Sequence, residues 1–410
     1  MTAQIIIMNK LCIGVASDSS VTLMGQRGPQ RTFPTAEKIF PLPAPHTMVV
    51  VHSGSTELLG VPYSVMVGEW IRTLPSEPLP TVADYGAHLR DWMAHQASLF
   101  TRKEQDAYFS MMVRETFLAV RSRILSACEE QGLGKDDWDS PVAGDIIDHS
   151  ITGIAEYLAE RPALECWDAV DGNALVLAHA DLVDEVREWV FDDTPRTAAG
   201  DIALNAIAVA VFAAFVEYGT DAVLLFAGYG ADQLFASTEQ LTCQGFLDGH
   251  LRTGPGVSSH VSTDMNSTII PLGQTEAART FLDGVHPDIS GAAHQRLHKF
   301  VTASKELINA GAALSSQLDR LADEAHEGLD SDIEEESRSK LVQPMLDTVA
   351  ALPPAEVVRM AEALVGLQVL RQLTQADAET VGGPIDLALI TRHEGVQWIR
   401  HKSLIGAKRE

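Results

Sequence analysis

The chain has 410 residues and a hydrophobic content of 46%, which is ample for a packed core in two or three domains or in one domain with insertions. Its formal net charge of −26 at pH 7 argues against non-specific binding to nucleic acid or to anionic membranes. The four cysteines have no CxxC spacing, so the sequence indicates neither a zinc site nor a disulfide framework, and we expect no metal or cofactor.

The sequence predicts no segment that enters a membrane. No charged-then-apolar leader opens the chain. The longest apolar stretch, residues 206–216, is shorter than the roughly 20 residues that a membrane-spanning helix needs. We therefore expect a soluble, cytoplasmic protein with reduced cysteines.

The first eighteen residues predict a buried β-hairpin. Ile5–Met8 and Leu11–Ala16 are apolar runs joined by two polar residues. Met1 precedes a small residue, and cytosolic aminopeptidases commonly remove an initiator methionine in that context. Removal would leave Thr2 with a free α-amine that titrates near about pH 8 and can act as the base for its own hydroxyl.

Two charged residues and one turn complete the predicted site. Asp18 ends the second strand, where the hairpin returns the chain beside Thr2. Lys38 follows as a cation that would favour the unprotonated amine, with Asp18 orienting it. The next apolar strand ends at Ser53-Gly54, whose backbone N–H groups can stabilise an oxyanion. The sequence thus predicts Thr2, Asp18 and Lys38 as catalytic residues.

The middle of the chain is mainly helical. A helix at 60–74 precedes a proline-rich segment, and amphipathic patterns then cover 82–99, 104–130, 145–160 and 178–190. Residues 199–218 are apolar nearly all round and predict a fully buried helix. Four strands are predicted after it, at 222–228, 233–237, 240–246 and 267–270.

The last third repeats this order of helices and then strands. Residues 286–375 have helical patterns, and His294 and His298 lie on one predicted helix face, where a surface or packed pair is favoured over a metal site because Gln295 stands where a zincin has glutamate. Strands are predicted at 380–390 and 395–399.

The ordered set of Thr2, the Val15–Thr22 segment, Glu37-Lys38-Ile39 and Ser53-Gly54 resembles the proteasome β-subunit and HslV family of N-terminal-nucleophile (Ntn) hydrolases. The spacing from Thr2 to Asp18 equals the spacing from nucleophile to aspartate in that family. The resemblance implies an α+β fold, a four-layer αββα sandwich with two large helical insertions. Its parts would be 1–75 (N-terminal part of the sandwich), 76–218 (helical insertion), 219–285 (central strands), 286–375 (second helical insertion) and 376–410 (C-terminal strands).

The same resemblance implies a threonine protease that cleaves amide bonds, most readily in peptides. Ser20 and Thr22 would pair through their backbone with an extended peptide or unfolded protein substrate. The family further implies a homo-oligomer, in the form of a ring, and an ATP-dependent unfoldase as partner.

The chain departs from the family pattern at two auxiliary positions. Leu272 stands where the family has the serine of a Ser-Gly pair, and Ala378 stands where it has an aspartate, with Asp377 and Glu379 as candidate substitutes. Two alternatives therefore stay open. One is a catalytically inactive ring or scaffold subunit, and the other is an amidohydrolase that acts on a small non-peptide amide.

Overall fold

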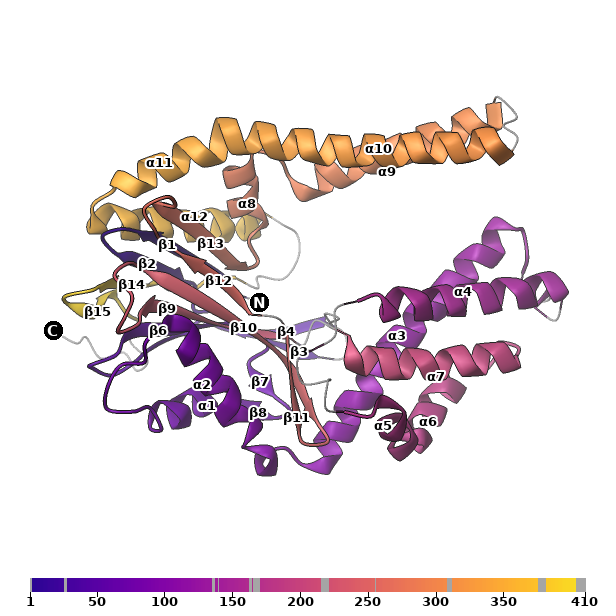
Figure 1. Ribbon diagram of the computed structural model, residues 1–410, viewed down its shortest axis with the longest axis horizontal. Helices are drawn as coiled ribbons and strands as arrows, with labels where there is room; N and C mark the ends of the chain where they lie inside the picture. The colour runs from indigo at the N-terminus through magenta and orange to yellow at the C-terminus, as the bar shows by residue number, and fades with distance from the viewer. Residues whose placement is uncertain are drawn as a thin grey trace.

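The structure is a computed structural model that describes residues 2–25, 28–134, 137–138, 140–161, 164, 170–214, 221–254, 256–307, 312–374 and 381–402. It is a mixed α/β protein with two main antiparallel sheets, a block of helices beside them and a long helical pair that extends away from them (Figure 1).

The first sheet has the strand order β13-β1-β2-β14-β15. Its strands are β1 (Ala3–Asn9), β2 (Ile13–Ser17), β13 (Ser267–Gly273), β14 (Asp386–Thr391) and β15 (Gly395–Arg400). The predicted hairpin is confirmed, because β1 and β2 pair in antiparallel register with Gln4 opposite Ser17. That register brings Asp18 back to the start of the chain, where its backbone N–H donates to the carbonyl of Ala3 at 3.0 Å.

The second sheet has the order β11-β10-β9-β6-β5, with β12 also paired to β10. Its strands are β5 (Ile39–Pro41), β6 (Thr47–Gly54), β9 (Ala222–Tyr229), β10 (Ser237–Leu247), β11 (His250–Thr253) and β12 (Val257–His260). Two small hairpins stand apart from it: β3 (Val21–Gly25) with β4 (Gly28–Phe33), and β7 (Glu57–Leu58) with β8 (Val61–Pro62).

One apolar cluster contains side chains from both sheets. Ile6 and Val15 of the first sheet pack with Val49, Val51 and Leu225 of the second. The opposite face of the first sheet contacts α12 (Pro354–Thr374) through Val357 and Ala361. The opposite face of the second sheet packs on α1 (Tyr63–Ile71) and α2 (Val82–Ala94).

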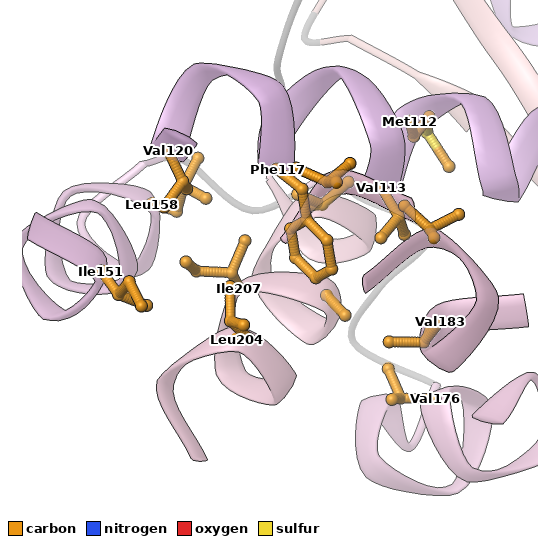
Figure 2. Close-up of a cluster of buried hydrophobic side chains, with 14 of the residues drawn as sticks. Met112, Val113, Phe117, Val120, Ile151, Leu158, Val176, Val183, Leu204 and Ile207 are labelled. Atoms are coloured by element: carbon orange, nitrogen blue, oxygen red, sulfur yellow. The ribbon is translucent and has the colours of Figure 1, made fainter. Parts of the chain in front are cut away.

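A separate block of helices has its own apolar core, which surrounds Phe117 (Figure 2). The block comprises α3 (Arg102–Glu130), α4 (Pro141–Ala159), α5 (Gly172–Ala178), α6 (Ala180–Val190) and α7 (Ala198–Ala213), preceded by the short 3-10 turn η1 (Ala97–Leu99). Side-chain caps explain where several of these helices begin: Thr101 and Glu104 form a capping box on α3, and Thr197 caps α7. Leu247 of β10 also belongs to this core and joins the block to the second sheet.

The second predicted helical region contains α9 and α10, which lie side by side and extend away from the sheets (Figure 1). Its elements are α8 (Glu276–Asp283), α9 (Pro287–Leu307), α10 (Ala312–Ser337), the π-helical turn η4 (Arg338–Val342), α11 (Gln343–Ala351) and α12. Because α12 packs on β1 and β2, this part of residues 286–375 covers a sheet face. The five domain boundaries themselves stay predictions.

Three sequence predictions are wrong in detail. Residues 233–236 are not a strand: the side-chain oxygen of Gln233 instead accepts hydrogen bonds from the backbone N–H groups of Val82 and Gly230, and β10 begins only at Ser237. Helix α7 is not buried all round, since Ile202 is 72% exposed, because only one face of α7 packs in the helical block. In the last third, the strand begins at Asp386 rather than at 380, after a turn at 382–384.

None of the helices in the described ranges combines the length and the apolar character that crossing a membrane requires.

Candidate active site

Asp18 is fully buried at the end of β2 and gathers the residues of the candidate site. Its Oδ1 accepts a hydrogen bond from the backbone N–H of Ala3 at 2.9 Å and from the Lys38 ammonium at 2.7 Å. Its Oδ2 accepts from the backbone N–H groups of Ser20 and Gly382, each at 3.2 Å. A buried carboxylate with this many donors is held in one orientation.

Lys38 lies directly before β5 and is also buried. Because the same Asp18 oxygen binds its ammonium and the amide of Ala3, the ammonium lies against the peptide that joins residues 2 and 3. Burial lowers the pKa of Lys38, and the charge and hydrogen bond of Asp18 oppose that shift. The geometry thus brings together Asp18, Lys38 and the start of the chain.

Thr2 is buried and is held by the residues that follow β13. Its carbonyl accepts a hydrogen bond from the backbone N–H of Gln274 at 2.6 Å. Gly273 has a φ of +76°, and a Cβ at this position would lie 2.1 Å from the Thr2 carbonyl oxygen and 3.0 Å from the Ser53 Oγ. Only glycine therefore fits at residue 273, and Ser53 lies near Thr2.

The Ser53-Gly54 turn ends β6, and the hydrogen bonds on either side of it show where its N–H groups point. His52 donates its N–H to the Lys38 carbonyl on the β5 side, and Ser55 donates to the Asp221 carbonyl on the β9 side. Because successive residues of a strand alternate sides, the Gly54 N–H points to the side on which Lys38 lies and the Ser53 N–H points to β9. Of the two predicted oxyanion donors, Gly54 is the one whose N–H faces the β5 edge of β6.

Between the two sheets, the side chains next to the candidate site are polar rather than apolar. The Gln4 Nε2 donates to the His52 carbonyl at 2.8 Å and to the Ser17 Oγ at 3.1 Å. The His52 ring bonds to the Ser55 carbonyl at 2.6 Å. Burial lowers the pKa of His52 to about 4, and the charge of Lys38 acts in the same direction, so this ring is neutral near pH 7.

A second buried ion pair lies beside the first. Lys402 forms a salt bridge with Asp386 and lies 3.5 Å from a carboxylate oxygen of Glu37, which His401 also contacts at 3.1 Å. Glu37, Asp386 and His401 each offer one ligand atom within 4.8 Å of the others. The Lys402 ammonium therefore lies between both carboxylates, where a metal ion would have to compete with a cation of the chain itself.

Strand β3 begins beside Asp18 and contains one of the two residues predicted to contact substrate. Ser20 gives its N–H to Asp18, whereas Thr22 lies opposite Thr32 in the β3–β4 hairpin. Within the described ranges β3 has β4 as its only partner strand, and a strand with one partner has a second edge that an extended peptide can pair with.

The structure describes one of the two auxiliary positions at which the chain departs from the family pattern. Leu272 is buried opposite Gln4, so this position presents an apolar side chain. Asp377, Ala378 and Glu379 lie outside the described residues.

Sequence reasoning missed several buried polar residues of this region, namely Gln4, Ser19, His52, Asp386 and Lys402. Gln4 had a usable signal, because it is polar within an otherwise apolar strand. Asp386 and Lys402 had none, since Asp386 lies within a predicted strand and Lys402 lies beyond the last one.

Comparisons with known proteins add little to this geometry. No family model matches the chain, and no curated protein does. A solved structure described as the Anbu (Gly-1) mutant from Hyphomicrobium sp. strain MC1 has 10% sequence identity and a TM-score of 0.30, over 98% of this chain and 86% of that one. A likeness at this level decides neither the fold nor the activity.

Proposed function

We propose that this chain is an N-terminal threonine hydrolase that cleaves amide bonds in peptides, on a four-layer αββα sandwich of the Ntn-hydrolase type. The observation that carries the proposal is the shared oxygen of Asp18, which binds the Lys38 ammonium and the amide that follows Thr2. A buried cation and the amide that follows a threonine, both bonded to one carboxylate oxygen, fit the arrangement that an N-terminal nucleophile requires.

The chemistry begins when release of residue 1 frees the Thr2 amine. The Thr2 Oγ attacks the substrate carbonyl carbon while the amine accepts the hydroxyl proton, directly or through water. Lys38 supplies positive potential that keeps the amine unprotonated and eases loss of the hydroxyl proton, and Asp18 keeps the lysine in place.

The tetrahedral oxyanion then receives a hydrogen bond from the Gly54 N–H. Collapse of this intermediate returns the proton from the amine to the leaving nitrogen and leaves an ester on Thr2. Water, activated by the same amine, hydrolyses the ester and restores the hydroxyl.

The test is to define the mature N-terminus and then to challenge it with an electrophile. Mass spectrometry of the purified chain should find Thr2 as the first residue. A β-lactone probe should modify Thr2, and fluorogenic peptides should be cleaved by wild type and by Thr2→Ser. Thr2→Ala should lose both reactions, and Lys38→Met should lower the cleavage rate about 100-fold or more.

The control variant is Thr302→Ala, which removes an exposed threonine hydroxyl on α9 and should react as wild type does. Peptide cleavage by a chain that retains Met1 would contradict the mechanism.

A second candidate function is a non-catalytic subunit of a ring or scaffold. The apolar Leu272 at an auxiliary position and the burial of Thr2 favour it. It predicts an intact Met1, no labelling by the β-lactone, and a homo-oligomer whose mass is measurable by light scattering. An ATP-dependent unfoldase partner belongs to the catalytic proposal and would be detected by ATP-dependent degradation of an unfolded protein.

A further inference from the structure

Lys402 and Asp386 form a buried pair that the chemistry above does not use. Asp386 is 1% exposed and Lys402 is 7% exposed. The Asp386 Oδ1 accepts the backbone N–H of Lys402 at 2.8 Å, and its Oδ2 pairs with the Lys402 ammonium. The two residues therefore fix each other through both main chain and side chain.

The turn at residues 382–384 joins this pair to Asp18. Ser19 donates its hydroxyl to the Pro384 carbonyl at 2.7 Å and its N–H to the Gly382 carbonyl at 3.2 Å. Gly382 in turn donates its N–H to Asp18. The Ser19 Oγ also lies 3.5 Å from the Asp386 Oδ2, so a single hydroxyl bridges the turn and the second carboxylate.

The Asp386–Lys402 pair also contacts the residue next to Lys38. Lys402 and His401 both contact Glu37, the residue directly before Lys38. His401 is held by stacking on Trp398 of β15, with ring centroids 4.1 Å apart. The Asp386–Lys402 pair thus contacts one sequence neighbour of each member of the Asp18–Lys38 pair: Asp386 contacts Ser19, and Lys402 contacts Glu37.

We propose that Asp386 and Lys402 are positioning residues, which hold the turn at 382–384 and Glu37 so that Asp18 and Lys38 keep their relative placement and charge. This inference rests on the proposed function, because it assigns the two residues to the same site.

The charges of Asp386 and Lys402 should change the pKa of Lys38 in opposite directions, which a role in packing alone would not do. Lys38 is surrounded by four charged or titratable side chains, Asp18, Asp386, Lys402 and His52, and it follows Glu37 in the sequence. Lys402 lowers the pKa of Lys38 and Asp386 raises it, in addition to the dominant effect of burial. Removing Lys402 should therefore raise the pKa of Lys38, and removing the charge of Asp386 should lower it.

The experiment measures the titration of Lys38 in the full-length protein labelled with [13Cε]lysine, in which the Lys38 signal is assigned by its absence from Lys38→Met. Lys402→Met should raise the pKa of Lys38, and Asp386→Asn should lower it, because each variant removes one of two opposing charges. In the double variant both charges are removed, so the pKa should lie between those of the two single variants.

Peptide cleavage supplies the second readout. The rate should fall at high pH as Lys38 loses its proton, so the alkaline limb should move to higher pH in Lys402→Met and to lower pH in Asp386→Asn. Lys340→Met and Glu336→Gln remove an exposed ion pair on α10 and η4 and should leave the profile unchanged.

The two readouts separate the possible failures. A wild-type chain that neither cleaves peptide nor reacts with the β-lactone contradicts the proposed function, while the NMR titration still tests the positioning of Lys38. A Lys38 titration that is the same in all variants, or that moves in one direction in both single variants, overturns the inference. If a single variant does not fold, Ser19→Ala takes its place. Loss of the Ser19 hydroxyl should loosen the turn at 382–384 and lower the cleavage rate, and a rate equal to that of wild type would overturn the inference.

Discussion

Asp18 stabilises the fold as well as the candidate site, because its carboxylate is buried against an ammonium and against backbone N–H groups from three parts of the chain. Asp18→Asn should lower the free energy of unfolding by about 3 kcal/mol, since it leaves the buried Lys38 ammonium without its counter-charge. Urea unfolding followed by circular dichroism measures the loss.

Two further variants check that explanation. Asp18→Asn combined with Lys38→Met should be less destabilised than Asp18→Asn alone, because the uncompensated charge is gone. Glu356→Gln removes one member of an exposed ion pair on α12 and should cost less than about 1 kcal/mol. A loss below about 1 kcal/mol in Asp18→Asn would be inconsistent with a buried pair.

His52 makes the stability of the protein depend on pH. Its pKa is lowered from 6.5 to about 4 in the folded chain, mainly by burial. Between these values the unfolded chain binds more protons, so the contribution of neutral His52 is fully present above about pH 6.5 and is lost as the pH falls toward 4.

We therefore expect the stability difference between pH 7 and pH 4.5 to be smaller in His52→Gln than in wild type by about 2 kcal/mol. Urea titrations at the two pH values measure this difference. His393→Gln, which replaces an exposed histidine, should behave as wild type does. If His52→Gln keeps the full wild-type pH dependence, folding does not change the pKa of His52.

At the scale of the elements, local patterns predict strands and helices but not the polar contacts between distant segments. Two apolar runs were enough to predict β1 and β2, and the register of this hairpin then places Asp18 beside Ala3. The polar pair Thr238-Glu239 suggested a break between two strands, although both residues lie within β10 and pair with β9 and β12. The pairing of neighbouring strands overrides local preference there.

The Asp386–Lys402 pair could not be predicted for a related reason. A buried charge has no periodic signature, and its partner is decided by the register of the β14–β15 hairpin, which returns Lys402 to the start of β14. Likewise, the side chain of Gln233 accepts a hydrogen bond from the first N–H of α2. This contact joins segments that are far apart in the sequence, so no local pattern predicts it.

The packing of α12 on the first sheet depends on a glycine in β2. A Cβ added at Gly14 would lie 2.9 Å from the Val357 Cγ1. Gly14→Ala should therefore destabilise the protein by about 1–3 kcal/mol through overpacking, and Val357→Ala in the same chain should relieve part of that loss. Urea unfolding of the two single variants and the double variant measures the coupling.

Gly366 of α12 provides the matched control, because a Cβ added there would have no neighbouring atom within 4 Å. Gly366→Ala should stabilise α12 by up to about 1 kcal/mol through helix propensity. Equal effects of alanine at Gly14 and at Gly366 would show that α12 does not contact β2 as described.

At the scale of the whole molecule, the apolar core of the helical block is distinct from the core between the two sheets. The block and the second sheet meet along β10 and β11, where the buried Arg252 donates to the carbonyls of Val211 and Ala214. A Cβ at Gly245 of β10 would lie 2.2 Å from the ring of Tyr108 in α3, and Leu247 enters the helical core. Because the two cores are distinct, we expect them to open with different free energies.

Phe117→Ala tests this division, because Phe117 is fully buried in the middle of the helical core (Figure 2). The substitution should cost about 3–5 kcal/mol. Hydrogen exchange followed by mass spectrometry should become faster in α3, α4 and α7 and stay near wild type in β1 and β2, so that the segment around Thr2 and Asp18 keeps its protection.

Phe226→Ala is the reciprocal variant, since Phe226 is buried between the second sheet and α1–α2. It should increase exchange in β9, α1 and α2 more than in α4 and α6. If Phe117→Ala opened β1 and β2 as much as α3, the helical block and the sheets would be one cooperative unit. The helical block would then affect the candidate site through the stability of the whole chain rather than through contacts of its own.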